Sequence, residues 1–122
     1  MFVVIVAGSR SFNDLSLMYN KLDYYLQKQD KVLIVHGGAN GADKCAATYA
    51  KDRNIETKVF LPDWDKYGKK AGILRNIEMF KYASQFQNRG CIVFWDGKSK
   101  GTKNDIELSE KYDVPLRIVE FR

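Results

Sequence analysis

The amino-acid sequence predicts a three-layer α/β fold of the Rossmann-like kind, with a five-stranded parallel sheet and helices on both faces. Short apolar runs alternate with amphipathic segments of helical length along the 122 residues. Two glycine-rich turns, His36–Asp43 and Asp96–Thr102, each connect an apolar run to a helical segment. Such turns are typical of phosphate sites, because small residues let backbone amides approach an anion. We therefore expect one domain, residues 1–122, that binds an anionic ligand.

Five runs of strand length are expected to form the sheet. They are Phe2–Ala7, Val32–Val35, Thr57–Leu61, Cys91–Trp95 and Leu116–Phe121. The first, second and fourth are continuously apolar, which is typical of parallel strands covered on both faces. The last alternates and follows Pro115, as an edge strand does. The right-handed crossovers of such folds favour the strand order 3-2-1-4-5.

Four helices are expected between these strands. They are marked by apolar residues from Leu15 to Leu26, by an alanine stripe at Ala42, Ala46, Ala47 and Ala50, by Ile73, Ile77 and Phe80, and by Ile106 with Leu108. We expect Asn13 or Asp14 to cap the first helix and Thr102 to cap the fourth. The alanine stripe predicts a second helix that lies close to the sheet.

The composition of the chain limits the classes of protein to which it can belong. The formal charge of +5 suits an anionic ligand, but it is lower than the dense basic clustering of a dedicated DNA-binding module. Cys45 and Cys91 form no CxxC pair and the chain has one histidine, so we expect reduced thiols, no metal and no cofactor. The apolar run at Phe2–Ala7 is too short to cross a membrane, and we expect a cytoplasmic protein.

The expected topology places the ligand. In the order 3-2-1-4-5 the winding reverses between the first and fourth strands, and ligands bind beyond the carboxyl ends of the strands at such a point. Three turns converge there, with these candidate ligand-binding residues: Gly8, Ser9 and Arg10; Gly37, Gly38, Ala39, Asn40, Gly41, Ala42 and Asp43; Asp96, Ser99, Lys100, Gly101 and Thr102.

Three residues in or next to these turns are given individual roles. Arg10 is expected to hold a phosphate through two parallel hydrogen bonds. Asp43 suits either a helix cap or a ribose contact, and both roles are compatible. We expect His36 to be a hydrogen-bonded strand-end residue rather than a catalytic one.

The segment from Asp63 to Asn76 is rich in aromatic residues and lysine. Trp64 and Tyr67 either stack on a base or cover the edge of the core. Arg75 and Asn76 are expected in the first turns of the third helix, facing either the crevice or solvent.

These motifs together resemble the SLOG superfamily, in particular its YspA-like branch. The resemblance rests on Gly8-Ser9-Arg10 with Phe12 and Asp14, on His36–Asp43, on Asp63-Trp64 with Tyr67-Gly68, on Ala71-Gly72, Arg75-Asn76 and Met79, and on Asp96-Gly97 with Ser99 and Gly101-Thr102. It covers nearly the whole chain. It implies a Rossmann-like fold that binds nucleotides or nucleotide-derived signals, including relatives of ADP-ribose.

The same superfamily includes the LOG phosphoribohydrolases, formerly called lysine decarboxylase-like proteins, which cleave the N-glycosidic bond of nucleoside monophosphates. The resemblance to them makes Arg75 and Asp105 the candidate catalytic residues, because Asp105 follows Gly101-Thr102 where that family has a glutamate. The chain departs from their pattern: asparagine stands at position 76 in place of lysine, and a Pro-Gly-Gly turn is missing.

Three functions are consistent with the sequence. The first is binding of a phosphorylated nucleoside or an ADP-ribose-like signal, as a sensor or sequestering protein. The second is hydrolysis of a nucleoside 5'-monophosphate. The third is binding of single-stranded nucleic acid, as in DNA-processing SLOG proteins, through the basic and aromatic segment Trp64–Lys70. We also expect a homodimer or higher homo-oligomer, because Phe80 and Tyr82 lie on different faces of one helix.

Overall fold

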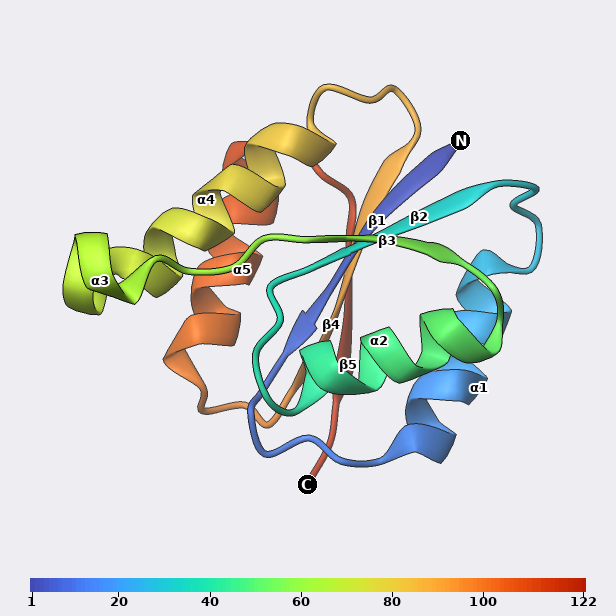
Figure 1. The fold of residues 1–122 in the computed structure, drawn as a ribbon. Helices are drawn as coiled ribbons and strands as arrows, with labels where there is room; N and C mark the ends of the chain where they lie inside the picture. Colours follow the sequence, from blue (N-terminus) through green and yellow to red (C-terminus); the bar gives the residue numbers. More distant parts are fainter.

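A computed structural model describes residues 1–122 and confirms the predicted sheet (Figure 1). Five strands lie parallel in the order β3-β2-β1-β4-β5. Their bounds are β1 (Phe2–Gly8), β2 (Val32–His36), β3 (Glu56–Val59), β4 (Arg89–Trp95) and β5 (Leu116–Glu120). The order places the reversal of winding between β1 and β4, as the sequence predicts.

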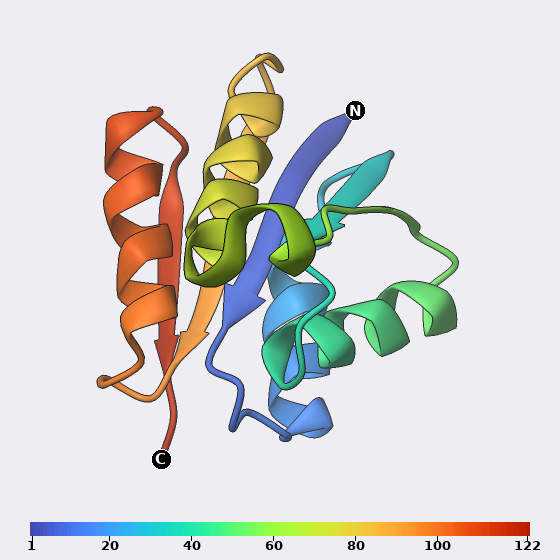
Figure 2. The ribbon, with the colours of Figure 1, turned by 60° about the vertical axis from the view of Figure 1, so that its left-hand side comes forward.

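The helices cover both faces of the sheet (Figures 1 and 2). They are α1 (Leu15–Leu26), α2 (Ala42–Asp52), α3 (Trp64–Tyr67), the 3-10 turn η1 (Gly68–Lys70), α4 (Ala71–Ala83) and α5 (Lys100–Lys111). The pair α1 and α2 packs on one face, and α4 and α5 pack on the other.

The strand β1 contributes alternate residues to the two cores. Val4 and Val6 pack with α1 and α2, whereas Val3 and Ile5 pack with α4. All four side chains are fully buried, which explains why the run is continuously apolar. Burial of such side chains contributes roughly 1.5–3 kcal/mol each, so the central strand anchors the turn that follows it.

The alanine stripe of α2 lies against the sheet in part. Ala42, Ala46 and Ala50 are buried, while Ala47 is half-buried. Ala42 lies so close to β1 that a Cβ on Gly8 would be 2.7 Å from the Ala42 Cβ. The first turn of α2 is therefore in direct contact with the end of β1.

Two local expectations were wrong. The N-cap of α5 is Ser99 rather than Thr102, because the Ser99 side chain accepts a hydrogen bond from the Thr102 amide. The third strand ends at Val59, not Leu61, and all its residues are exposed because it lies at an edge of the sheet. At α1, Asp14 is the cap, since its Oδ1 accepts from the Leu17 amide at 3.0 Å.

The apolar side chains of α4 that were expected to remain exposed pack against other residues of the same chain. Phe80 is fully buried, and Tyr82 lies between Phe60 and Phe86 with ring centroids 5.6 and 5.2 Å apart. This packing covers the aromatic residues of α4, and the expected homo-oligomer stays a prediction.

None of the helices combines the length and the apolar character that crossing a membrane requires. No group of three or more histidine, cysteine, aspartate or glutamate side chains is placed to hold a metal ion. Cys45 and Cys91 are free thiols.

Candidate functional site

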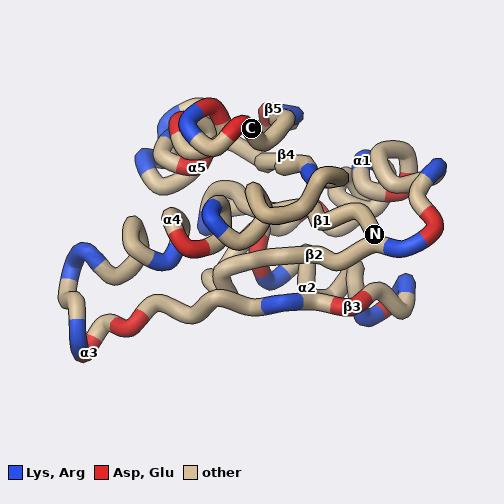
Figure 3. The backbone as a smooth tube through the Cα atoms, turned by 90° about the horizontal axis from the view of Figure 1, so that it is seen from above, with Lys and Arg blue, Asp and Glu red and all other residues tan.

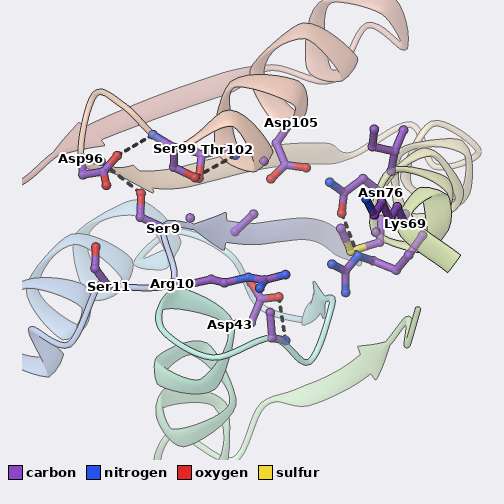
Figure 4. A pocket seen from close by; sticks show the side chains of 18 of the residues that line it. Ser9, Arg10, Ser11, Asp43, Lys69, Asn76, Asp96, Ser99, Thr102 and Asp105 are labelled. Atoms are coloured by element: carbon purple, nitrogen blue, oxygen red, sulfur yellow. Dashed lines mark hydrogen bonds between the residues drawn. The ribbon is translucent and has the colours of Figure 1, made fainter. Parts of the chain in front are cut away.

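A cleft of about 500 Å³ opens beyond the carboxyl ends of β1 and β4, where the winding reverses (Figure 4). Segments far apart in the sequence meet there: the turn after β1, the start of α2, the α3–α4 segment and the start of α5. The lining residues are Ala7, Gly8, Ser9, Arg10, Ser11, Ala39, Asp43, Trp64, Lys69, Gly72, Ile73, Arg75, Asn76, Met79, Asp96, Ser99, Gly101, Thr102 and Asp105.

The turn after β1 forms the floor of the cleft. Gly8 is required there by close packing, because a Cβ would collide with the Phe94 carbonyl oxygen. Ser9 is buried, and its Oγ accepts a hydrogen bond from the Asp96 amide at 3.1 Å. Ser9 therefore joins the loops that follow β1 and β4, while Arg10 is exposed and extends across the cleft toward Asp43 (Figure 4).

The loop before α5 is ordered by Asp96. Its Oδ1 accepts from the amides of Lys98 at 2.9 Å and Ser99 at 2.8 Å, and these bonds lower the pKa of the Asp96 carboxyl. In the first turn of α5, no protein group accepts a hydrogen bond from the amides of Lys100 and Gly101. These two amides are therefore available to a ligand at the start of α5, where Gly101 lines the cleft.

The turn after β2 differs from the predicted phosphate cradle. Asp43 is buried, and its Oδ2 accepts from the amides of Gly37 at 3.1 Å and Ala39 at 3.2 Å. The Gly38 amide donates to Nδ1 of His36 at 3.1 Å, and the Ala42 amide donates to the Ser9 carbonyl at 3.2 Å. The protein's own groups therefore occupy four of the amides that were expected to bind phosphate.

Burial shifts the pKa values of the titratable groups in this turn. Burial raises the pKa of the Asp43 carboxyl, against the opposing effects of its amide donors and of Arg75 and Arg10. Burial also lowers the pKa of His36, and the charge on Arg75 adds to that effect. A neutral His36 accepting from Gly38 agrees with the expectation of a hydrogen-bonded strand-end residue.

Gly41 fixes the junction between this turn and the floor. Its φ is +80°, and a Cβ there would overlap the backbone of Ser9 and Arg10. Gly41 and Ala42 do not line the cleft. Their role is to hold the start of α2 against the turn after β1.

Arg75 lies on the first turns of α4, buried to 8% exposure. Its Nε donates to Asn76 Oδ1 at 2.8 Å, and its Nη1 donates to the carbonyl oxygen of Gly37. Burial lowers the pKa of Arg75, although Asp43 and Asp105 favour its charged form. A side chain at Gly37 would collide with the guanidinium. Arg75 therefore supports the turn after β2 while lining the cleft.

Asp105 lies on α5 with 5% of its surface exposed, and it lines the cleft. Its Oδ1 is buried without a hydrogen-bond partner, and no cation lies within 4 Å of the carboxyl. Burial raises the pKa of Asp105 well above its usual range; nearby Asp43 raises it further and Arg75 opposes the shift.

The two aromatic candidates, Trp64 and Tyr67, line different spaces in the structure. Trp64 is 50% exposed and lines the cleft, with its Cη2 atom 3.5 Å from where a Cβ would stand on Gly72. Tyr67 faces a separate depression beside Ala71 and Leu74, and Lys66 Nζ lies 5.1 Å from its ring centre. The structure therefore does not bring Tyr67 to the site.

Other expected site residues lie next to the cleft rather than in it. Gly37, Gly38 and Asn40 line a neighbouring hollow, and Lys100 lines neither space. The cleft adds residues that the sequence did not assign: Ala7, Ser11, Lys69, Gly72, Ile73 and Met79. Ser11 follows Arg10 directly and Lys69 belongs to the lysine-rich segment, so proximity to assigned residues was the available signal.

Comparison with known proteins identifies the family of the chain. Residues 2–67, more than half of the chain, match the family described as YspA, cpYpsA-related SLOG. The chain is also 33% identical over 119 residues to Gene 61 protein of Mycobacterium phage D29, covering 93% of this chain and 92% of that protein. The matched region contains β1, β2, β3 and the turns after β1 and β2. The chain therefore belongs to the YspA, cpYpsA-related SLOG family.

Proposed function

We propose that the cleft binds a phosphorylated nucleoside, so that the protein serves as a sensor or sequestering protein for a nucleotide signal. Membership of the SLOG family supports a nucleotide-related role. The identity of the phosphate site and of the base site is argued from the geometry.

The unpartnered amides of Lys100 and Gly101 are the observation that carries this proposal. They lie at the positive end of the twelve-residue helix α5. The backbone at Gly101 is open, since a Cβ added there would meet nothing within 4 Å. A phosphate placed there accepts from both amides, with Arg10 extending over the cleft to add a charged donor (Figure 4).

Trp64 provides the surface on which the base of the ligand stacks. Its ring is half-exposed on the wall of the cleft, and a tryptophan that packs on one side against Gly72 offers its remaining surface to a planar ligand. Stacking of a base on an aromatic side chain contributes about 1–3 kcal/mol. The cleft thus combines an anion site with a stacking surface.

Titration calorimetry with AMP, GMP, CMP, UMP and ADP-ribose tests the proposal. Arg10→Ala is expected to weaken binding roughly 10- to 100-fold, because hydrogen bonds to charged groups contribute about 1.5–3 kcal/mol. Arg117→Ala, on the exposed middle of β5, is the matched control and is expected to leave affinity unchanged. Failure of every phosphorylated nucleoside to bind would contradict the proposal.

Hydrolysis of the bound nucleotide is a second candidate, favoured by the unpartnered carboxyl of Asp105 in the same cleft. Burial favours the protonated form of Asp105, which suits general-acid catalysis. The acid would give its proton to the base as the C–N bond breaks, while water adds its oxygen to the ribose C1' and releases a proton that restores the acid. Chromatography of free adenine released from AMP distinguishes an enzyme from a binding protein. Turnover that persists in Asp105→Asn would remove Asp105 from the mechanism.

Binding of single-stranded nucleic acid is a third candidate, favoured by exposed lysines around the cleft. They are Lys66, Lys69, Lys70, Lys98, Lys100 and Lys103. Figure 3 shows basic residues along α3 and the start of α4. A labelled oligonucleotide titrated at several salt concentrations tests this function, since phosphate contacts make affinity fall steeply with salt.

A further inference from the structure

A second hollow of about 400 Å³ adjoins the cleft. Arg10, Ala39, Trp64 and Arg75 line both spaces. The hollow continues beyond them along the turn after β2 and the segment after β3, where it is lined by Gly37, Gly38, Asn40, Leu61 and Pro62. Because four residues line both spaces, the cleft and the hollow adjoin, and we refer to the two together as the trough.

The far end of the trough has an apolar floor. Leu61 is 72% exposed although it is a large apolar residue, and Pro62 lines the hollow with it. Gly38 brings its backbone against this surface: its φ is +69°, and a Cβ would lie 2.7 Å from Leu61 Cδ2. An exposed apolar patch bordered by the polar side chain of Asn40 suits a planar ring with a hydrogen-bonding edge.

The middle of the trough is basic. Arg10 and Arg75 line both spaces, and neither forms an ion pair within 4 Å. Arg75 donates to Gly37 and Asn76, whereas no protein group accepts a hydrogen bond from the Arg10 side chain. Two guanidinium groups at the place where the two spaces adjoin are complementary to a phosphate bridge, which accepts hydrogen bonds from such donors.

We propose that the trough takes a dinucleotide, with one base beside Trp64 in the cleft, the second on Leu61 and Pro62, and a bridging phosphate between Arg10 and Arg75. The inference rests on the proposed function, because the first nucleotide occupies the cleft described above. It adds Asn40, Leu61 and Pro62 as the residues that recognise the second nucleoside.

The test compares AMP with the 5'-phosphorylated dinucleotide pApA by titration calorimetry. Because one further base contact contributes about 1–3 kcal/mol, pApA is expected to bind at least about fivefold more tightly than AMP. Leu61→Ala is expected to weaken pApA binding roughly three- to tenfold through lost apolar contact and to leave AMP binding unchanged. Leu15→Ala removes another exposed leucine, at the start of α1, and is expected to alter neither affinity.

The outcomes separate the two proposals. Equal affinities for AMP and pApA, or pApA binding that does not respond to Leu61→Ala, overturn the second ring site and leave the proposed function standing. Absence of binding by both ligands removes the proposed function and this inference with it. A longer oligonucleotide that binds much more tightly than pApA, with a steep salt dependence, replaces the dinucleotide site with a nucleic-acid groove.

Discussion

The carboxylate of Asp43 lies 3.1 Å from the backbone nitrogen of Gly37 and accepts its hydrogen bond, so a residue of α2 holds the turn that precedes that helix. The same oxygen accepts from Ala39 at 3.2 Å. Asp43 therefore lines the cleft itself and holds the turn that lines the neighbouring hollow.

Asp43→Ala is expected to destabilise the protein by about 1–3 kcal/mol, because it leaves buried amides without an acceptor. Asp43→Asn keeps one acceptor oxygen and is expected to cost less. The free energy of unfolding in urea measures both changes. Asp65→Ala, at an exposed position of α3, is the control; an Asp43→Ala protein as stable as this control would contradict the role of Asp43.

Asp105→Asn is expected to change how stability depends on pH. The pKa of Asp105 is raised in the folded state, so its contribution to stability is fully present below the unfolded pKa and is lost as pH rises through the folded pKa. Asparagine does not ionise, so the variant is expected to gain in melting temperature over the original protein as pH rises above the usual pKa of a carboxyl and through the raised pKa of Asp105.

Thermal melts at several pH values measure this effect, at roughly 4 °C for each kcal/mol in a domain of this size. A difference in melting temperature that stays constant across the series would show that Asp105 does not ionise in this range, or that its charge is compensated.

Gly41→Ala is expected to destabilise the fold by about 2 kcal/mol or more, because φ is +80° and the added methyl group meets the backbone of Ser9 and Arg10. Gly101→Ala is the matched control, since it lies in α5 and its Cβ meets nothing. It is expected to be neutral or stabilising by about 0.5 kcal/mol. Urea unfolding compares the pair, and similar losses in both would count against the packing of Gly41.

Ser99→Ala is expected to cost about 1 kcal/mol through loss of the α5 cap. Ser16→Ala, on the exposed surface of α1, removes the same hydroxyl without removing a cap and is expected to change stability little. The comparison is made by thermal unfolding. Ser99→Ala melting together with Ser16→Ala would show that the cap contributes nothing.

The fold was predictable because its signals are local. The continuous apolar character of β1 and β4 predicts parallel strands, and the alternation of strands and helices predicts the sheet order. The turns of the site were predictable for the same reason, since glycines directly after an apolar run mark the carboxyl ends of strands.

The role of each side chain in the site was less predictable, because that role depends on contacts between segments distant in the sequence. The contact of Arg75 with Gly37 joins residues 38 positions apart, and no sequence pattern indicates it. The hydrogen bonds from Gly37 and Ala39 to Asp43 depend on how the turn folds back, so free amides were expected where occupied ones are found. Tyr67 and Trp64 are close in sequence, yet α3 directs them to different hollows.

The two walls of the cleft differ in how firmly they are held. On one wall, the Asp96 amide donates a hydrogen bond to the Ser9 hydroxyl. The Ser9 carbonyl oxygen also accepts a hydrogen bond from the Ala42 amide, and the Ser9 amide donates one to the Phe94 carbonyl oxygen. Ser9 therefore connects β1, β4 and α2. The opposite wall, α3 with η1, has no buried residue. For the nucleotide proposed above, we expect the hydrogen-bonded side of the cleft to hold any phosphate alike, and the wall that carries Trp64, where no residue is buried, to discriminate among bases.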